Sequence, residues 1–478
     1  MTDTAANTPT SPWRLFSVVG SAMVLTALNF SISFVAFGEI AETFDAEGTT
    51  VSWALTAFSI TIGALIVPGG WAADRYGRAR MFATGFAVFL LGSGLVALAP
   101  TVELLVAARV VQAAGVAFQG PAMLALMLDA FGPDRRATAV GVTGGLGGVA
   151  AAAGPAIGGA MVESVGWRWT FAANIPIGLI VLAVLLRLLT FERPADGGDV
   201  PDLPGVLLMV GAVAGFILGI VQSDDWGFAD VRTIGSVAGS VVLGAALIRR
   251  SRRHPSPILD LDLFTIPSFR SGMGLQLLVA GSFGGVFLTE LQFLTDGWNL
   301  SLLEAGLAIA AIPAIAGPLT VVAGRVADRH GHRTVIVPGM VGMIAAGLGF
   351  ALLIGDEQHL WSRWVPINAL YAVGVGLAHA ACQAVAVNDV PAERLGMGAG
   401  MSRISQEIGN ALTAAIAITL IERASTPADG LQATMVMLIA LTTIALPVAW
   451  QLPRRRPRFG HSLTTSGSPT LSGDVPRS

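Results

Sequence analysis

Four ionisable side chains interrupt long apolar stretches of this sequence, and their types suggest the chemistry of a membrane interior. They are Arg109, Glu290, Arg403 and Glu407. A charge at the centre of a membrane-spanning helix costs about 2.5–3.5 kcal/mol by insertion scales, so each one needs a structural or functional reason. A buried carboxyl group can take up and release a proton, and a buried guanidinium can bind carboxylates, carbonyls or water. The pattern predicts proton exchange or ligand contact within a membrane.

Glu290 and Glu407 are the candidates for carrying a proton. Arg403 precedes Glu407 by one helical turn, a spacing at which oppositely charged side chains meet. Two interpretations are open for this pair: an internal ion pair without a role in transport, or a carboxyl group that exchanges protons or contacts substrate. Glu290 has no charged residue within a turn, and it lies either in the core or at the outer interface near Asp296. Arg109 either faces a cavity or extends to the membrane surface.

The composition places these residues in a protein with many membrane spans. Of the 478 residues, 53% are hydrophobic and 12% are charged, whereas a soluble protein carries about 25% charged residues. A helix needs about 20 apolar residues to cross the hydrocarbon core. Stretches of that length predict fourteen spans, at residues 15–38, 51–69, 81–99, 104–128, 138–162, 169–189, 203–222, 231–248, 271–295, 304–323, 334–354, 365–387, 397–421 and 431–451.

The arginines orient these spans. All 28 basic residues are Arg. With the N-terminus inside, most of them fall on one side of the membrane, including the cluster Arg249, Arg250, Arg252 and Arg253. The opposite side receives only Arg168, Arg232, Arg363 and Arg423. By the positive-inside rule both termini are predicted to be cytoplasmic. The net charge of −3 gives no general attraction to nucleic acid.

A short polar loop occurs twice between apolar stretches. The first copy, at residues 70–80, reads GWAADRYGRAR, and the second, at residues 324–333, reads GRVADRHGHR. The first follows the second predicted span, and its copy follows the tenth. The copies are in register only if spans 7 and 8 are an insertion between two halves of six spans each. The repeat therefore predicts an all-α integral membrane fold of 14 transmembrane helices, with two six-helix halves and an inserted two-helix hairpin.

The same repeat gives the predicted segments of the chain. They are a cytoplasmic N-terminal tail at 1–14, an N-terminal half at 15–190, the hairpin with its cytoplasmic linkers at 191–270, a C-terminal half at 271–452, and a disordered cytoplasmic tail at 453–478.

Several motifs together resemble one family of transporters. The doubled loop is similar to the signature loop of the major facilitator superfamily, and fourteen spans with a central hairpin resemble its drug:proton antiporter branch. Leu104–Gly115 (LLVAARVVQAAG) is similar to the fourth-helix motif of that family. The segment Gly154, Pro155, Ala156, Ile157, Gly158 and Gly159 resembles the fifth-helix packing motif of its exporters. The run Trp167–Phe171, followed by Asn174, Pro176 and Gly178, is similar to a sequence of the antiporter branch.

The resemblance implies that the two loops act as conformational latches. In the family, the matching carboxylate faces the cytoplasmic start of a helix in the other half. Asp74 would then meet span 13 near Met397, and Asp328 would meet the start of span 5. An anion at a helix N-terminus is stabilised by about 0.3–1 kcal/mol, and by up to about 2 kcal/mol when partly buried. The predicted latch residues are Gly70, Asp74, Arg75, Gly77, Arg78, Gly324, Asp328, Arg329, Gly331 and Arg333.

The resemblance also locates a gap in the expected coupling machinery. In the antiporter branch the first helix carries an acid that couples transport to protons, and here Asn29 stands in its place. Asn cannot carry a proton, so proton coupling requires Glu290 or Glu407. Polar side chains of the central helices are expected to line the substrate cavity. The candidates are Asn29, Arg109, Gln112, Gln292, Arg403 and Gln406.

No catalytic or metal-binding pattern appears in the sequence. The chain has one cysteine, Cys382, and its six His residues are scattered, so we predict no metal site and no cofactor. No phosphate-binding P-loop is present, which argues against an ATP-driven pump and against an enzyme. The sequence gives no indication of oligomeric state.

We interpret the chain as a secondary active efflux transporter of the bacterial cytoplasmic membrane. It would export amphipathic or apolar small molecules by alternating access as a proton antiporter, with the lipid bilayer, the substrate and protons as its partners. The alternative within transport is a weakly coupled or uncoupled exporter of a lipid or metabolite. A non-transporting membrane sensor on the same fold is the alternative of a different class.

Overall fold

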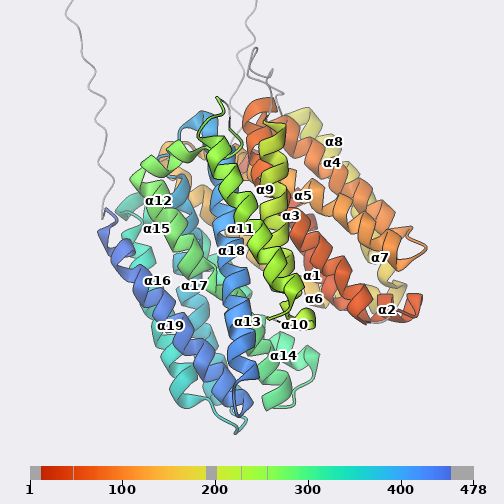
Figure 1. Cartoon of the computed structure of the whole chain (residues 1–478), viewed down its shortest axis with the longest axis vertical. Helices are drawn as coiled ribbons and strands as arrows, with labels where there is room; N and C mark the ends of the chain where they lie inside the picture. The colour runs from red at the N-terminus through yellow and green to blue at the C-terminus, as the bar shows by residue number, and fades with distance from the viewer. Residues whose placement is uncertain (1–11, 47, 190–201, 228, 256, 454–478) are drawn as a thin grey trace, which may run out of the picture.

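The computed structural model describes residues 12–46, 48–189, 202–227, 229–255 and 257–453, and all regular structure within them is helical (Figure 1). The predicted terminal tails at 1–14 and 453–478 fall almost entirely outside the described residues, as does most of the linker that precedes the hairpin. The helices gather into two groups with a pair of helices in front of them (Figure 1).

The N-terminal group contains eight helices within the described residues. Their bounds are α1 (Pro12–Val35), α2 (Phe37–Phe44), α3 (Gly48–Tyr76), α4 (Arg78–Ala97), α5 (Val102–Phe131), α6 (Arg136–Val165), α7 (Trp167–Ala172) and α8 (Asn174–Leu188), with a short 3₁₀ helix, η1 (Pro133–Arg135), before α6. Gly77, with φ of 97°, separates α3 from α4. Only glycine adopts this conformation readily, so the residue fixes where the chain turns back.

A hairpin follows, formed by α9 (Leu203–Val221), α10 (Ser223–Trp226) and α11 (Val231–Ser251). The two long helices pack closely because glycines of α9 face α11: a Cβ built at Gly219 would lie 3.4 Å from the Thr233 carbonyl oxygen. On its other side α9 packs against α3, where the Ile217 side chain fills the space beside Gly63. The hairpin is therefore attached to the outer surface of the bundle.

The C-terminal group begins with a 3₁₀ turn and contains three π-helical segments. Its bounds are η2 (Leu261–Thr265), α12 (Pro267–Leu275), η3 (Gln276–Ala280), α13 (Ser282–Gln292), η4 (Phe293–Gly297), α14 (Leu302–Ile309), α15 (Ala311–His330), α16 (Arg333–Leu353), η5 (Leu360–Trp364), α17 (Val365–Val387), η6 (Ala392–Arg394), α18 (Leu395–Glu422) and α19 (Pro427–Gln451). The π segments η3 and η4 lie on either side of α13 in one continuous span. Single π turns within α-helices occur often at functional sites.

Twelve helical segments of the described residues are long and apolar enough to cross a membrane. The prediction of fourteen included two more, at residues 15–38 and 138–162. Those two positions are occupied by α1, with 24 residues, and α6, with 30 residues. Both helices contain positions whose side chains lie outside the described set, and neither is among the twelve.

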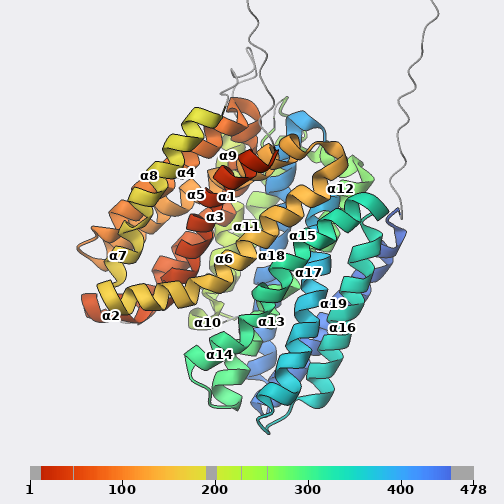
Figure 2. The same cartoon turned by 180° about the vertical axis from the view of Figure 1, so that it is seen from behind.

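The two groups meet along two seams, α6 against α15 and α3 against α18, and the first is seen in Figure 2. In both seams glycine brings backbone against backbone. A Cβ built at Gly141 would lie 2.4 Å from the Thr320 carbonyl oxygen, and one at Gly70 would lie 2.2 Å from that of Gly396. These contacts lie toward the end of the bundle that carries the repeated loops, which we call the loop end. Toward the other end the ribbons of the two groups diverge, with α2 and α7 on one side and α14 on the other (Figure 1).

Candidate functional site

The first repeated loop, where α3 meets α4, contacts the start of α18 in the other half. The Asp74 carboxylate accepts one hydrogen bond from the Gly396 amide at 2.9 Å and another from the Met397 amide at 2.8 Å. Both amides belong to the first turn of α18, where backbone N–H groups have no partner within the helix. The carboxylate therefore caps that helix from the opposite half, and its charge lies at the positive end of the helix dipole.

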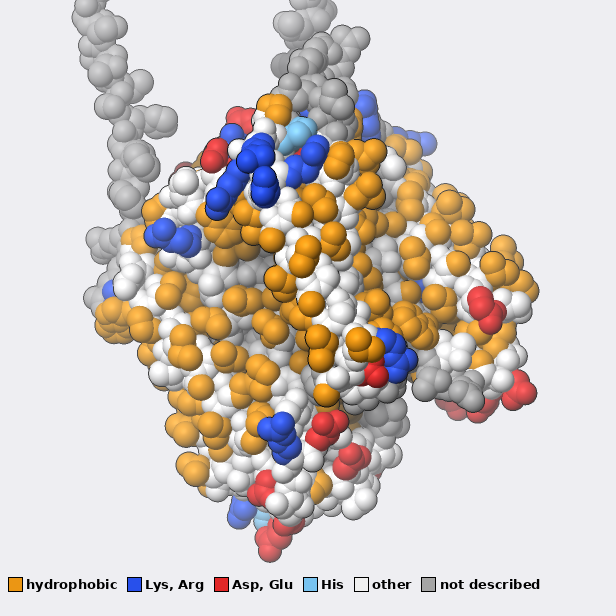
Figure 3. Space-filling model, viewed as in Figure 1, with side chains coloured by type: hydrophobic (Ala, Val, Ile, Leu, Met, Phe, Trp, Pro, Cys, Tyr) orange, Lys and Arg blue, Asp and Glu red, His pale blue; other side chains and the backbone are white. Residues whose placement is uncertain are grey.

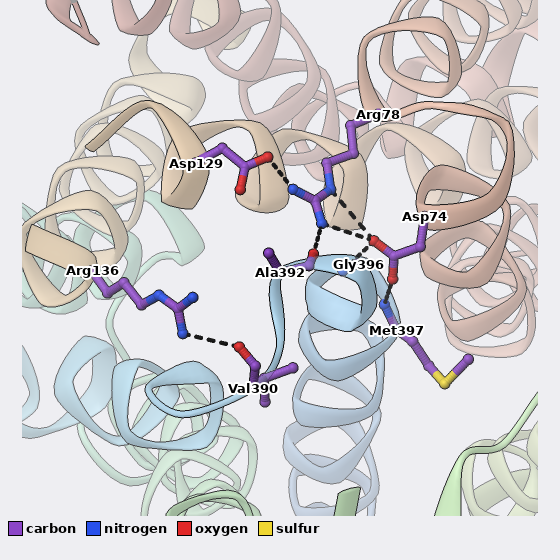
Figure 4. A network of polar contacts seen from close by, with 8 residues as sticks. All are labelled: Asp74, Arg78, Asp129, Arg136, Val390, Ala392, Gly396 and Met397. Atoms are coloured by element: carbon purple, nitrogen blue, oxygen red, sulfur yellow. Dashed lines mark hydrogen bonds and ion pairs between the residues drawn. The ribbon is translucent and has the colours of Figure 1, made fainter. Parts of the chain in front are cut away.

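Arg78 extends this contact into a network (Figure 4). Its guanidinium forms an ion pair with Asp74 at 3.2 Å and a second with Asp129 at the end of α5. It also donates a hydrogen bond to the Ala392 carbonyl in η6, which belongs to the other half. One side chain thus joins α3, α5 and the segment that leads into α18. Arg75 of the same loop lies 5.6 Å from the centre of the Trp71 ring.

The second repeated loop, where α15 meets α16, contacts the start of α6. The Asp328 carboxylate accepts hydrogen bonds from the Ala137 amide at 3.0 Å and the Thr138 amide at 2.8 Å, and the Thr138 hydroxyl donates a third. Gly331, with φ of 93°, makes the same chain reversal as Gly77 does.

The remaining residues of the second loop differ in their contacts. A Cβ built at Gly324 would lie 2.4 Å from the Ala137 carbonyl oxygen, so this glycine permits the close approach of α15 to α6. The Arg333 guanidinium lies 3.8 Å from the centre of the Trp450 ring, within its own half. Arg329 is exposed. Asp328 and Gly324 of this loop therefore contact the opposite half directly.

Arg136, the first residue of α6, adds a contact that the sequence did not predict. Its Nη1 donates hydrogen bonds to the carbonyls of Val387 at 2.7 Å, Asn388 at 2.5 Å and Val390 at 3.2 Å, and the last is drawn in Figure 4. These carbonyls end α17 and begin the turn that follows, where no helical N–H is available to them. Every residue has a backbone carbonyl, so a contact made to carbonyls requires no particular residue type. For this reason no sequence motif indicated it.

In the N-terminal half, Arg109 lies at the centre of a buried polar cluster. Its Nη1 donates to the Asn29 side-chain oxygen at 3.3 Å and to the Gln112 side-chain oxygen at 2.5 Å, and Gln112 donates to the Ser93 hydroxyl at 2.8 Å. The guanidinium lies 4.0 Å from the centre of the Phe58 ring. Arg109, Asn29 and Gln112 are each at most 1% exposed, so none of the three is open to a ligand in this conformation.

In the C-terminal half, Glu290 is fully buried on α13. Its carboxyl group lies beside the Asn368 side chain, and Tyr371 is within range of its charge one turn further along α17. Within the described residues no polar side-chain atom of these three makes a hydrogen bond of normal geometry. One turn toward the other end of the bundle, the rings of Phe293 and Trp364 stack with centroids 5.7 Å apart. The structure therefore places Glu290 in the core, not at the outer interface near Asp296.

Arg403 and Glu407 form the internal ion pair that their spacing permits, with a nitrogen–oxygen distance of 2.7 Å. Their side chains are 45% and 27% exposed, so the pair is not in the closed core. Gln406 points elsewhere and lies 3.1 Å from the His379 ring nitrogen. Gln292 contributes to a cavity of about 220 Å³ between the far ends of α13 and α18. The predicted cavity-lining residues are therefore divided among four places.

One family model, described as Major Facilitator Superfamily, matches residues 19–289 and 272–469, which together are most of this chain. The chain belongs to the Major Facilitator Superfamily. It is accordingly a multi-pass membrane transporter and not an enzyme. The all-helical fold of the described residues, with its twelve candidate spans, agrees with this membership.

Characterised relatives of this superfamily protein carry the names of export proteins. It is 29% identical over 418 residues to the "Tetracenomycin C resistance and export protein" of Streptomyces glaucescens, which covers 86% of this chain and 77% of that protein. It is 29% identical over 414 residues to the "Multidrug efflux pump LfrA" of Mycolicibacterium smegmatis, covering 85% and 80%.

Solved structures show the same fold at lower sequence identity. The human organic anion transporter MFSD10 matches with a TM-score of 0.67 at 15% identity, over 92% of this chain and all of that one. The transporter FucP in its outward conformation matches with a TM-score of 0.65 at 11% identity, over 92% of this chain and 99% of that one.

The glycine-rich face of α6, which includes the fifth-helix packing motif, contacts two different helices. Gly145 packs against the Gly317 carbonyl of α15, whereas Gly158 packs against Ile32 of α1 in its own half. Gly154 is buried and Gly159 lies near Val35, also of α1, while the Pro155 side chain lies outside the described residues. The motif thus sets the packing of α6 on α1.

Two further ion pairs at the loop end were not predicted. Asp260, in the segment after the hairpin, pairs with Arg394 of η6 at 2.6 Å. Asp202, which caps the start of α9, pairs with Arg250 near the end of α11. Within the described residues no group of three or more His, Cys, Asp or Glu could hold a metal ion.

Proposed function

We propose that this superfamily protein is an efflux transporter that exports amphipathic or apolar small molecules by alternating access. The names of its relatives support export. The observation that carries the mechanism is the reciprocal pair of carboxylate contacts, Asp74 on the start of α18 and Asp328 on the start of α6. Each contact crosses between the halves, so each exists only while the loop end is closed.

The two contacts act as latches for one of two global states. Because a carboxylate gains stability from a helix N-terminus only when it touches it, these contacts favour the state with a closed loop end. If the loop end is cytoplasmic, as the arginine distribution predicts, the favoured state faces outward. The proposal includes fourteen spans, with α1 and α6 as the two beyond the twelve, and both termini in the cytoplasm.

Distance measurement between the halves tests the latches. In a Cys382→Ala background, spin labels at Arg80 and His330 would report the loop end, because both residues are exposed and belong to opposite halves. We expect a short distance to dominate in the wild type and a longer one to grow when a latch is removed. An unchanged distribution in Asp74→Asn would exclude the latch role.

Glu290 and Glu407 are the proposed coupling residues for proton antiport. Glu290 has a fully buried carboxyl group whose oxygens have no hydrogen-bond partner among the described residues, and a carboxylate in that environment is costly. Gaining or losing a proton at Glu290 therefore changes the stability of the C-terminal half. Glu407 already has Arg403 as its counter-ion. A substrate that separates these two side chains would therefore change the charge environment of Glu407. Glu290 is therefore assigned the proton and Glu407 the coupling to substrate.

Transport in everted vesicles under an imposed pH gradient tests this assignment. Glu290→Gln is expected to abolish gradient-driven efflux while substrate exchange between identical compartments continues. Glu407→Gln should weaken efflux and substrate affinity together. If both variants keep wild-type gradient-driven efflux, proton coupling through these acids is wrong.

A weakly coupled exporter of a lipid or metabolite is the second candidate, and one observation favours it. Arg109 donates hydrogen bonds to the neutral side chains of Asn29 and Gln112, and its other terminal nitrogen has no partner among the described residues. Efflux that releases no protons from the vesicle lumen would support this candidate over antiport.

A further inference from the structure

Three arginines at the end of α11 share one surface of the hairpin. Arg249, Arg252 and Arg253 are all exposed, and within the described residues none of them forms an ion pair or a side-chain hydrogen bond. Their spacing of three and four residues places them next to one another around the last turn of the helix. Arg250 differs, because it turns inward and pairs with Asp202 of α9. Three guanidinium groups that have no acidic partner among the described residues thus lie close together at the end of α11.

These arginines form the polar end of a groove with an apolar floor. The groove has a volume of about 490 Å³ and is lined by Arg249, Arg252, Arg253, Ala245 and Ile248. Ile248 is 42% exposed, and one to two turns away Val241 and Val242 are 64% and 67% exposed. Figure 3 shows this arrangement as basic side chains at the upper edge of the hairpin face, with hydrophobic side chains below them. Along α11 the surface therefore changes from basic to apolar, as a membrane lipid changes from its headgroup to its acyl chains.

We propose that this α11 groove binds an anionic phospholipid. Arginine is the residue best suited to hold a phosphate group, because its planar guanidinium donates two parallel hydrogen bonds to phosphate oxygens. The apolar floor would contact the acyl chains directly below the headgroup. The bound lipid would relieve the mutual repulsion of the three cations, which no acid of α11 neutralises.

The positive-inside effect alone does not require this arrangement. Topology depends on the number of basic residues near a span end, not on their grouping around a groove. α11 is also the least buried of the twelve candidate spans, with 17% of its apolar stretch buried within the protein. In a membrane it would therefore face lipid, and lipid headgroups would lie beside these arginines.

Lipid retention in native mass spectrometry tests the proposal. The full chain would be extracted from nanodiscs of phosphatidylcholine that do or do not contain phosphatidylglycerol. We expect the wild type to retain phosphatidylglycerol selectively. Because each basic residue near an anionic surface contributes about a fivefold gain in affinity, the triple variant Arg249→Gln, Arg252→Gln, Arg253→Gln should bind this lipid roughly a hundredfold more weakly.

Two control variants separate lipid binding from folding and from simple charge. The triple Arg→Lys variant keeps the charge and the insertion signal but loses the bidentate geometry, so its affinity should fall between wild type and the Gln triple. Arg423→Gln removes an exposed arginine at the far end of α18 and should leave retention unchanged. Equal retention of phosphatidylglycerol by the wild type and the Gln triple would overturn the proposal. Competition by inorganic phosphate as strong as that by the lipid would overturn it too.

Discussion

The loop between α3 and α4 and the loop between α15 and α16 can be compared residue by residue. In each, an acid accepts hydrogen bonds from two consecutive amides at the start of a helix in the other half: Gly396 and Met397 for Asp74, and Ala137 and Thr138 for Asp328. A glycine with φ above 90° follows three residues later in both. The backbone geometry of the latch is therefore the same on both sides.

The side chains around the two acids differ. Arg78 of the first loop pairs with Asp74 and Asp129, whereas His332 occupies the matching position of the second loop and lies 3.4 Å from the Asn388 side chain. In exchange, Arg136 reaches the Val387 and Asn388 carbonyls at the second site. Both latches thus include a basic side chain that donates to backbone carbonyls of the other half. In the first this residue, Arg78, belongs to the loop, and in the second, Arg136, it belongs to the helix that the loop contacts. The acid and its two amides are the part that both latches share.

The largest expected effect comes from a substitution that blocks the close approach of the two halves without changing any charge. In Gly70→Ala the new methyl carbon would lie 2.2 Å from the Gly396 carbonyl oxygen, and the neighbouring atoms are also backbone. The loop end should then fail to close, and the longer distance between the Arg80 and His330 labels should dominate. Gly235→Ala is the matched control, because nothing lies within 4 Å of a Cβ there.

The second effect concerns Arg136, whose contacts join the start of α6 to the turn after α17. Arg136→Gln removes hydrogen bonds from a charged donor to backbone carbonyls, each worth about 1.5–3 kcal/mol. The closed state should lose at least that amount, which is visible as a growing open fraction by the same labels. The adjacent Arg135 is exposed, and Arg135→Gln should change nothing. If the two variants behave alike, the carbonyl contacts do not stabilise closure.

Neutralising the two acids separately should give unequal effects. Asp74→Asn also removes the ion pair with Arg78, so we expect a loss of about 2 kcal/mol, or a thirtyfold change in the state ratio. Asp328→Asn removes the negative charge at the start of α6, and the helix-dipole contribution alone is worth about 1 kcal/mol. High salt should reduce the difference between the two variants. An equal loss at low salt would show that Arg78 adds nothing to the latch.

The smallest effect concerns the third hydrogen bond of the second latch. Thr138→Val removes the hydroxyl that donates to Asp328 but keeps the shape of the side chain. The closed state should lose about 0.5–1.5 kcal/mol, the net value of a single hydrogen bond. Thr143→Val is the control, since that hydroxyl bonds only to carbonyls of its own helix.

The sequence allowed the backbone of this site to be predicted better than its side-chain partners. The position of Asp74 near Met397 was implied by the resemblance of its loop to the signature loop of the superfamily, in which the matching carboxylate faces a helix start. The role of Arg136 could not follow, since its partners are carbonyls that any residue supplies. The packing of Gly158 against Ile32 could not be predicted either. A small residue indicates that another helix approaches closely, but it does not indicate which helix.

Buried charges show the same limit. Residue types indicated that Arg109 and Glu290 need partners, and the spacing of Arg403 and Glu407 indicated that these two could meet. That Asn29 accepts a hydrogen bond from Arg109 depends on how α1 packs against α5. Such a contact between distant segments has no periodicity from which to predict it.

The glycine contact between α6 and α15 has a mechanical consequence. α6 has 30 residues and is therefore about 45 Å long. Its backbone touches α15 at Gly141 and Gly145, about 8–14 Å from the loop end of the helix. If the halves rotate about this contact, the far end of α6 moves roughly two to five times as far as the end that carries the latch. A small separation at Asp328 is thus amplified into a large displacement on the opposite side of the membrane.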